Sequence, residues 1–459
     1  MLTDLDFIAV GKEFPPKPER KRLADIESDR KLYGGEHADV FAEALRRIEK
    51  TNVWEHRSDS VILNWCEKVP LVFADLLAGE PGSIYATDTA KQEALDALTR
   101  DLKLMSSVHE GTVEIGAVGD CVVKLSLDGR KLMPVPAEFW FPVVDKRDTR
   151  NILRHVIAWV TNIGTKDKPV YQGYAEIHDP GSITEMTFDC KKASHVENVY
   201  RIERIASSTA ISTGIDTPLV FHIPNPKRSV RQLHGPSDIG SMQSIVAELE
   251  VRFAGVSKVL DKHTDPTAYG PNAASETEDG AVYYETGGYI ELPDKETPIP
   301  GYATWDGQLE ANRWFIEKLV EQLYVDTETC PALFGRIDSG QGVTESASAL
   351  KRLLIRPLAK VNRLRMAWND AIPGIIATAA KLRNTDVGII RVDWRDGVPD
   401  DPEETARTEE LLRRCGVRSR KLSVATVTGY SGVELDREVA AITAEDTVEV
   451  PEMTLPGVV

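Results

Sequence analysis

An apolar side chain recurs every three or four residues from Leu350 to Ile376, which is the spacing of one face of an α-helix. The members of this stripe are Leu350, Leu354, Leu358, Val361, Leu364, Trp368, Ile372 and Ile376. At 3.6 residues per turn they extend over about seven turns, so the chain must bury one side of a long rod. Because the proline at position 357 removes a backbone donor and clashes with the preceding turn, we expect a bend near residues 349–356.

Two polar features border this long helix. Before it, residues 333–343 read "LFGRIDSGQGV", and the glycines of this loop allow many backbone conformations at low steric cost. The side opposite the stripe carries basic residues without an acid among them: Lys351, Arg352, Arg356, Lys360, Arg363 and Arg365. A solvated face is the ordinary interpretation of such a charge run. Because the whole chain has a net charge of −17, acidic surfaces on neighbouring copies are an alternative partner for this face.

Two more helical patterns precede the loop and enclose a β-rich segment. Residues 237–263 would form a helix roughly 40 Å long. Its stripe is Ile245, Leu249, Phe253, Val256 and Leu260. Residues 306–332 carry a second stripe, formed by Phe315, Leu319 and Leu323 and widened by Ile316, Val320 and Tyr324. Between them, residues 264–305 are rich in Gly and Pro but contain strand formers in "AVYYE" and "GYIEL". Helices joined by so short a segment are expected to be neighbours.

The first 236 residues have the pattern of an α+β module. Apolar spacing predicts helices over residues 38–50, 61–77 and 88–110, with the proline at position 70 kinking or dividing the second. From residue 113 the pattern changes to short runs of β-formers separated by Gly, Asp and Lys turns. These runs are "CVVKLSL", "FWFPVV", "HVIAWV", "VYQGYAEI" and "PLVFHI".

The C-terminal region has the pattern of one strand followed by helices. "VGIIRVDW" is the strand, and a helix is expected to start at Asp401 and stop at Gly416. Ser419 can cap a further short helix that continues through Val427. The last residues, "TAEDTVEVPEMTLPGVV", are typical of a flexible acidic tail or a partner-binding strand.

Length, charge and cysteine content exclude several classes. A chain of 459 residues exceeds one ordinary core, so two or more modules are expected. The net charge of −17 argues against general DNA binding, because counterion release rewards proteins that present Lys and Arg to phosphates. Apolar runs stay below the roughly 18 to 20 residues of a membrane helix, and the N-terminus lacks a secretion signal, so an intracellular protein is expected. The five scattered cysteines indicate neither a disulfide framework nor a zinc ribbon.

The sequence lacks the signatures of catalysis. There is no glycine-rich phosphate loop, and "GPSDIG" at 235–240 places its second glycine too late for a nucleophile elbow, so Ser237 is better explained as a helix cap. The nine histidines form no HxH or HxxxH pair, and the acidic run at 396–404 lacks the spacing of a calcium loop. Trp314 and Trp368 lie on or beside helical stripes, which favours core or subunit packing over base stacking. We therefore expect no catalytic residue, no cofactor and no metal site.

The order of these parts resembles the portal proteins of tailed bacteriophages. An α+β body, a strut helix, a β segment, a returning helix, a glycine-rich loop, a long kinked helix and a helical C-terminal module follow one another. Three stretches carry the local similarity: "FHIPNPKRSVRQLHGPSDIGSMQSIVAELEVRFAGVSKVLDKH", "PALFGRIDSGQGVTESASALKRLLIRPLAKVNRLRMAWNDAI" and "VDWRDGVPDDPEETARTEELLRRCGVRSRKLSV". The resemblance extends from about residue 30 to residue 440 and is most specific over 221–420.

This resemblance implies a mainly helical α+β portal fold with named domains. The first four would be a wing over 1–236, a stem helix over 237–263, a β-containing clip over 264–305 and a second stem helix over 306–332. The others would be a tunnel loop over 333–343, the long kinked helix over 344–385, and a crown with a C-terminal tail over 386–459.

The resemblance also implies a ring of about twelve copies that forms a DNA channel at one capsid vertex. The tunnel-loop residues facing double-stranded DNA, without reading its sequence, would be Arg336, Asp338, Ser339, Gly340, Gln341 and Gly342. A basic face toward a neighbouring subunit or the channel would consist of Lys351, Arg352, Arg356 and Lys360. Stem packing between subunits would use Ile245, Leu249, Phe253, Phe315, Leu319 and Leu323.

The partners implied by the resemblance are the major capsid protein, the terminase large subunit, a head-tail adaptor protein and a scaffolding protein. The protein would lie at the portal vertex of the virion after assembly in the bacterial host cytoplasm, with no membrane contact. Two other classes stay open. A nucleic-acid enzyme would need a carboxylate cluster or nucleophile and would show activity with magnesium. A non-catalytic scaffold or binding protein without a DNA channel would be distinguished from a ring by its size in solution.

Overall fold

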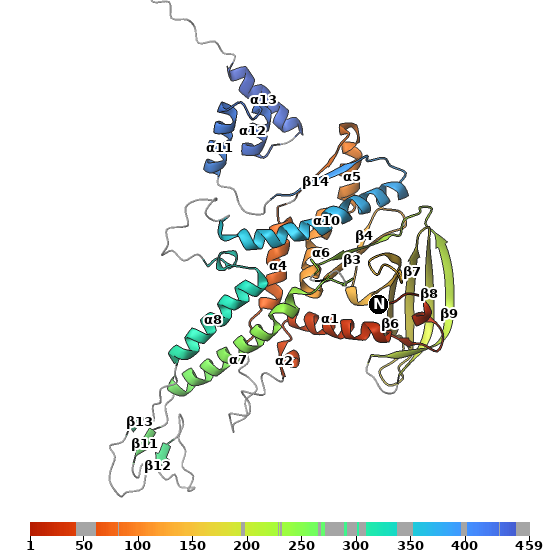
Figure 1. Ribbon diagram of the computed structural model, residues 1–459, viewed down its shortest axis with the longest axis vertical. Helices are drawn as coiled ribbons and strands as arrows, with labels where there is room; N and C mark the ends of the chain where they lie inside the picture. The colour runs from red at the N-terminus through yellow and green to blue at the C-terminus, as the bar shows by residue number, and fades with distance from the viewer. Residues whose placement is uncertain are drawn as a thin grey trace, which may run out of the picture. The chain divides into compact units, whose positions relative to one another are not determined.

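The computed structural model divides the chain into two compact units. Unit 1 comprises Met1–Leu333 and Arg356–Gly397, and unit 2 comprises Phe334–Ile355 and Val398–Val459 (Figure 1). The residues that the structure describes are 1–42, 61–80, 82–193, 198–227, 229, 232–264, 268–270, 289–291, 301–302, 309–336, 352–395, 402–430 and 432–446.

Helices from the first 118 residues form the centre of unit 1. Those described are α1 (Arg20–Tyr33), α2 (His37–Val40), α4 (Trp65–Ala78), α5 (Gln92–Asp101) and α6 (Leu104–Val118). Short 3₁₀ helices occur both here and later in the described chain: η1 (Asp6–Ile8), η2 (Lys17–Glu19), η3 (Thr89–Lys91), η4 (Ala137–Phe139) and η5 (Pro331–Phe334). α4 packs against α6, and the side chains of Val69, Phe73, Val108 and Ile115 are buried in this region.

Several predicted boundaries in this region are wrong. The helix expected over 88–110 is interrupted, because Lys103 has a left-handed φ of 48° that separates α5 from α6. α6 continues to Val118, past the point where β structure was expected to start. Pro70 does not divide α4, which runs through it. α1 was not predicted because it buries only Ile26, Asp29 and Leu32, too sparse a pattern to detect.

A six-stranded antiparallel sheet with the order β1-β9-β8-β7-β6-β5 forms the other side of unit 1 (Figure 1). Its strands are β1 (Glu13–Phe14), β5 (Trp140–Val144), β6 (Ile152–Asn162), β7 (Tyr171–Asp179), β8 (Ser182–Lys192) and β9 (Tyr200–Ser212). Phe14 packs against Phe141 and Phe188, with ring centroids 5.1 and 6.1 Å away. The sequence did not predict β8 or β9, since β9 exposes most of its side chains and lacks an apolar run.

Two smaller sheets join segments that are distant in the sequence. β10 (Val220–Pro224), β3 (Asp120–Leu125) and β4 (Leu132–Val135) pair in that order. β14 (Ile390–Asp393) pairs with β2 (Ser83–Ala86). The expected strand in "VGIIRVDW" is therefore present. It belongs to unit 1, however, so a crown starting at residue 386 would include a strand that pairs with the N-terminal region.

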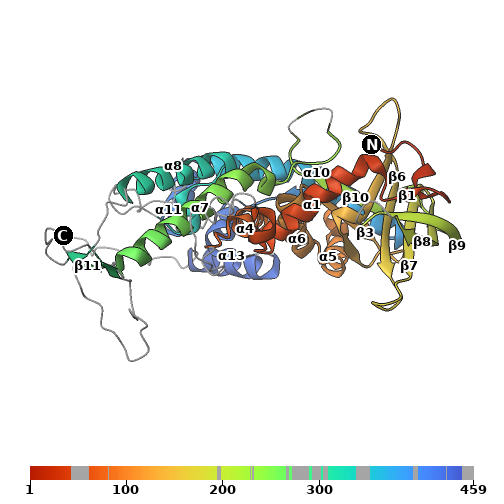
Figure 2. The ribbon, with the colours of Figure 1, turned by 90° about the horizontal axis from the view of Figure 1, so that it is seen from below.

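Two long helices project together from the body of unit 1 (Figure 2). They are α7 (Asp238–Thr264) and α8 (Leu309–Thr327), and they pack against each other as the short connection predicted. Of the segment between them the structure describes only β11 (Ala268–Gly270), β12 (Tyr289–Glu291) and β13 (Gly301–Tyr302), which form one sheet. α8 ends at Thr327, before the end of the helix expected over 306–332, and residues 306–308 lie outside the described residues.

The long helix α10 runs from Ile355 to Leu382. Its buried residues include Val361, Leu364, Trp368, Ile372 and Ile376, which confirms that part of the apolar stripe. The bend expected near residues 349–356 is confirmed by a turn at Leu354, which separates the helical residues 352–353 from α10. Pro357 itself lies in the first turn of α10, where a missing N–H has no helical partner to lose, and α10 continues through a second proline, Pro373.

Unit 2 contains three described C-terminal helices: α11 (Pro402–Arg414), α12 (Arg420–Thr428) and α13 (Gly432–Asp446). The predicted cap at Ser419 is confirmed, because its Oγ accepts a hydrogen bond from the Leu422 amide. Gly416 follows α11 with a φ of 71°, consistent with the predicted stop. The expected flexible tail is wrong for residues 443–446, which are helical, and 447–459 lie outside the described residues. No described helix is long and apolar enough to span a bilayer.

A half-buried carboxylate in the large sheet makes unit 1 sensitive to acid. Glu176 accepts hydrogen bonds from His178 and from the ammonium of Lys124, and these bonds lower the pKa of Glu176 to about 2. Because the pKa of Glu176 is lower in the folded chain than in the unfolded chain, its ionised carboxylate stabilises the fold at pH values above the unfolded pKa. This stabilisation is lost as the pH falls toward 2.

We therefore expect Glu176→Gln to cost about 1–2 kcal/mol at neutral pH, after allowing for partial exposure. The cost should shrink steadily below about pH 5. Urea unfolding over a pH series measures it. Glu185→Gln is the matched control, since Glu185 is exposed and lies directly opposite Glu176 on β8. A loss of unfolding free energy in Glu176→Gln that does not change with pH would contradict the lowered pKa of Glu176.

Candidate functional site

The α7–α8 pair buries one face and exposes another. Val246, Leu249 and Leu323 are buried within the chain. Arg252 lies over the ring of Phe315, 5.0 Å from its centroid. Two of the predicted contacts between subunits are therefore wrong: Leu249 and Leu323 have no exposed surface left to offer a neighbour.

Large apolar side chains nevertheless remain exposed along the same helices. Trp314 is 60% exposed and Val325 is 68% exposed, and both lie on one side of α8 because eleven residues make about three helical turns. Phe253 and Leu260, two turns apart on α7, are 36% and 49% exposed. Ile245, Phe315 and Leu319 are half-buried. The sequence interpretation of Trp314 as a core or subunit packing residue fits this exposed position, whereas Val325 was not predicted because it lies outside the apolar stripe of the helix.

The basic residues predicted to share one exposed face of the long helix do not all lie on the surface. Lys360 is buried, with its ammonium 2.9 Å from Asp238 and 4.0 Å from the centroid of the Phe73 ring. Arg365 is also buried. Arg356 and Arg352 are exposed, while Lys351 lies outside the described residues. A buried ion pair with Asp238, at the first residue of α7, links the long helix to the stem.

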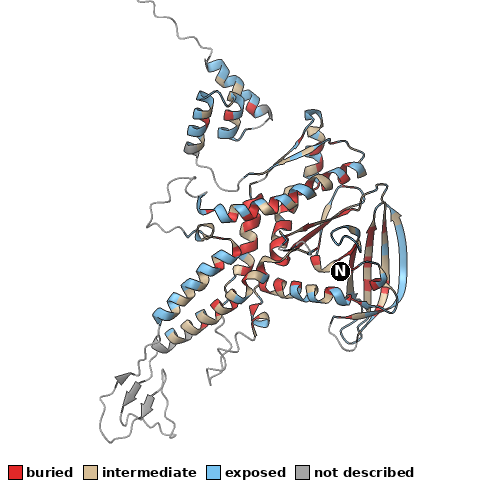
Figure 3. Cartoon of the chain, in the orientation of Figure 1, coloured by how far each residue is buried: buried red, intermediate tan, exposed pale blue. Residues whose placement is uncertain are grey.

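The middle of α10 is wedged into the helical core of unit 1. The indole N–H of Trp368 donates a 3.0 Å hydrogen bond to Thr112 Oγ1 on α6. A Cβ added at Gly111 would lie only 2.9 Å from the Trp368 ring, so α6 and α10 approach closely at this point. Figure 3 shows buried residues concentrated where α4, α6 and α10 meet, in contrast to the more exposed α7 and α8. The middle of the long helix is thus held firmly against α6.

Of the predicted tunnel loop, the structure describes only the beginning. Gly335 has a φ of 70° and Arg336 is exposed. The other loop residues named above lie outside the described residues: Asp338, Ser339, Gly340, Gln341 and Gly342.

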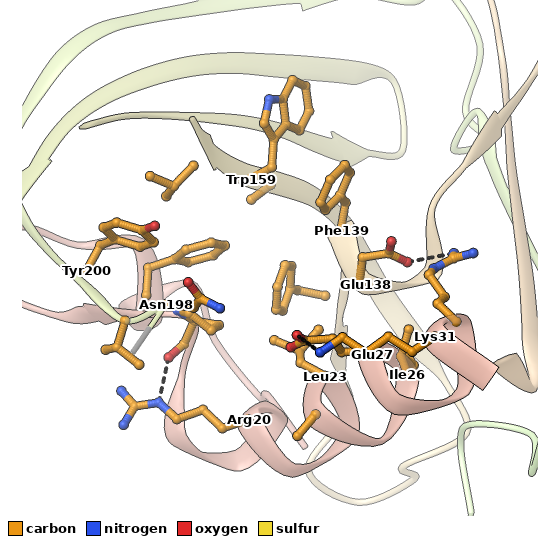
Figure 4. Close-up of a pocket in the computed structure, with 18 of the residues that line it drawn as sticks. Arg20, Leu23, Ile26, Glu27, Lys31, Glu138, Phe139, Trp159, Asn198 and Tyr200 are labelled. Atoms are coloured by element: carbon orange, nitrogen blue, oxygen red, sulfur yellow. Dashed lines mark hydrogen bonds and ion pairs between the residues drawn. The ribbon is translucent and has the colours of Figure 1, made fainter. Parts of the chain in front are cut away.

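A cavity of about 700 Å³ lies between α1 and the large sheet. Figure 4 shows Leu23 and Ile26 of α1 on one side and Phe139 and Trp159 on the other. The charged groups at its rim are engaged: Arg20 pairs with Glu13, Lys31 with Glu27, and Arg30 with Glu138. Its lining comes from four separate stretches of chain, which is why no local pattern predicted it.

Long paired helices with exposed apolar side chains, anchored in a packed α+β body, are typical of a protein that packs against other protein surfaces. The sequence model of one family, described as phage portal protein, SPP1 Gp6-like, matches residues 17–451. This chain therefore belongs to the phage portal protein family, and the resemblance stated above is confirmed.

The solved structures to which this chain is similar include chains from gene transfer agent particles. A chain from the virion of a native particle is 9% identical, with 94% of this chain and 96% of that chain covered and a TM-score of 0.45. A chain from the neck of a native particle, computed with C12 symmetry, is 10% identical, covering 78% and 89%, with a TM-score of 0.42. A chain from the neck of an empty particle, computed with C6 symmetry, is 11% identical, covering 79% and 89%, with a TM-score of 0.45. No curated protein matches the chain.

Proposed function

We propose that this portal protein forms a closed ring of about twelve copies at one capsid vertex, through which double-stranded DNA enters, is retained and leaves. The observation that carries the proposal is membership of the portal family over residues 17–451. Support from this chain is the exposed apolar face of α7 and α8, because a ring buries such a face between neighbouring subunits. Electron microscopy of the purified protein tests it: rings with a central opening are expected, and monomers at every concentration would contradict it.

A channel for any genome has to contact DNA without binding it tightly. The net charge of −17 favours walls that repel phosphate, an effect that reaches roughly 8 Å at physiological salt. Short polar side chains of the tunnel loop can contact phosphate or water without reading bases. A stationary base for this loop is provided by α10, whose Trp368 is fully buried.

The proposed ring also serves as a docking platform. Its partners would be the terminase large subunit, whose ATPase supplies the packaging energy, a head-tail adaptor protein, the major capsid protein and a scaffolding protein. Assembly would take place in the bacterial host cytoplasm. A non-catalytic oligomer without a DNA channel is the second candidate, and rings with a closed centre in the micrographs would favour it.

The tunnel loop should be dispensable for folding and needed for DNA passage or retention. Replacing Arg336, Asp338 and Gln341 with Ala should change the free energy of unfolding by no more than about 0.5 kcal/mol per site, as for exposed positions in general. Ring yield should stay unchanged, whereas packaged DNA per particle should change, because two charges leave the channel. Thermal unfolding, micrographs and DNA content of particles assembled with this variant measure all three.

A matched control replaces Arg201, Glu203 and Thr209, which are exposed on β9, with Ala. This variant removes the same types of charge away from the loop. Unchanged DNA content in the loop variant, or loss of its rings, would show that residues 333–343 are not the tunnel loop.

A further inference from the structure

Three potential metal ligands from distant parts of the chain meet inside unit 1. Asp120 opens β3, His222 lies in β10, and His234 lies in the segment before α7. Asp120 Oδ1 is 2.7 Å from His222 Nε2, and Asp120 Oδ2 is 2.7 Å from His234 Nδ1. The three ligand atoms all lie within 4.8 Å of one another. They are thus close enough to share one cation.

The backbone holds these side chains in place. In the antiparallel pairing of β10 with β3, Asp120 lies opposite Pro224 and His222 lies opposite Val122. The Asn225 amide donates a 2.8 Å hydrogen bond to Gly119 O. Gly235 lies so close to Gly119 that a Cβ on either residue would be about 2.2–2.3 Å from the other's carbonyl oxygen. The segment that carries His234 is therefore fixed against the start of β3 before any cation arrives.

The nearest partners of the buried Asp120 carboxylate are histidines, and no lysine or arginine of the described residues lies within ion-pair distance of it. The Asp120 side chain is 2% exposed, and its hydrogen-bond donors are the two imidazoles and the Gly235 amide. A buried carboxylate is costly without a cationic partner.

The site also has an opening. A cavity of about 590 Å³ is lined by Asp120 and His234, together with Asp29, Gly235 and Ser237. The His234 side chain is 22% exposed, whereas that of His222 is 6% exposed. A cation could enter from this side, and the cavity has room for water molecules that complete its coordination.

We propose that Asp120, His222 and His234 bind one divalent transition-metal cation of the Zn²⁺ type. Two imidazole nitrogens and one carboxylate form a common zinc donor set that leaves a coordination position for water. Tetrahedral Zn²⁺ with bonds of about 2.0 Å separates its ligand atoms by about 3.3 Å, so the two histidine-to-aspartate pairs, now 2.7 Å apart, would open by roughly 0.6 Å. The cation replaces the two histidine-to-aspartate hydrogen bonds and neutralises the buried carboxylate.

The bound cation would tie the β3–β10 sheet to the segment that leads directly into the stem helix α7. This role goes beyond the channel function, which involves no metal chemistry. It would stabilise the connection from which the stem projects.

The test starts from full-length protein freed of metal with a chelator. Calorimetric titration with ZnCl₂ should show one site per chain, CoCl₂ should give a visible absorption band, and ZnCl₂ should raise the melting temperature of the wild type. His234→Gln should weaken binding by more than the roughly 10- to 100-fold that loss of an outer-shell partner costs. The matched control is His109→Gln. His109 pairs with one carboxylate, that of the exposed Asp75, so this substitution should leave zinc binding unchanged.

Circular dichroism establishes that each variant is folded, and His222→Gln serves as a second ligand variant. If neither ligand variant folds, the zinc titration of the folded wild type decides the proposal by itself. Weak or substoichiometric zinc binding by folded wild type overturns the proposal and leaves a purely hydrogen-bonded network. Equal binding by His234→Gln and wild type also overturns it. Ring formation is scored separately, so a failure of the metal site is distinguishable from a failure of the channel function.

Discussion

Trp314→Glu is expected to raise the protein concentration needed for ring assembly by at least about 30-fold. The Trp314 side chain is 60% exposed in the isolated chain, although an indole gains much from burial against a neighbour. Interface tryptophans commonly contribute about 2 kcal/mol or more, and 1.4 kcal/mol corresponds to a factor of ten. A carboxylate in the same place would also be buried without a partner. Light scattering and micrographs over a concentration series measure the shift.

The isolated chain should tolerate this change, since an exposed substitution on α8 costs within about 0.5 kcal/mol. Ile163→Glu is the matched control, because Ile163 is 55% exposed but follows β6, away from the stem. Val325→Glu should reproduce the assembly defect, since Val325 lies on the same side of α8. Normal rings from both stem variants would rule out this face of α8 as a subunit interface.

Trp368→Ala should destabilise unit 1 by about 3–5 kcal/mol, the usual cost of removing a large buried aromatic side chain. Trp368 is fully buried where α10 meets α6, and its loss would leave a cavity beside Gly111. Its indole also donates to Thr112 Oγ1, which in turn donates to the Val108 carbonyl. Urea unfolding of the full chain, followed by circular dichroism, measures the loss.

Met366→Ala provides the control on the same helix, because Met366 is 65% exposed and alanine favours helix. Its effect should stay within about 0.5 kcal/mol. The loss of unfolding free energy in Trp368→Phe should lie between those of Trp368→Ala and Met366→Ala, since phenylalanine keeps most of the volume but loses the hydrogen bond. A loss below about 1 kcal/mol in Trp368→Ala would mean that α10 is not anchored at this point.

Local patterns predicted the elements that bury a regular stripe. The stripe from Val361 to Ile376 predicted α10, and the capping residue Ser419 predicted the start of α12. Both signals depend on neighbours within a few turns, so they do not require knowledge of the fold. The same reasoning failed for β9, whose exposed side chains carry no apolar alternation.

Side-chain roles were less predictable than elements. Lys360 has the charge of a surface residue, but Asp238 and Phe73 surround it from two other helices. Leu249 and Leu323 were assigned to contacts between subunits because a stripe shows that a face is buried without showing against what. Packing within the chain itself buries both.

The sequence by itself therefore determined the long helices, because periodicity and capping are encoded in short stretches of chain, and its resemblance to portal proteins indicated the family. Tertiary structure alone decided that β14 pairs with β2 across some 300 residues and that Asp120, His222 and His234 converge. Spacing rules for metal ligands detect only residues on one turn or one strand. Contacts between distant segments depend on how whole elements pack, and no local pattern records that packing.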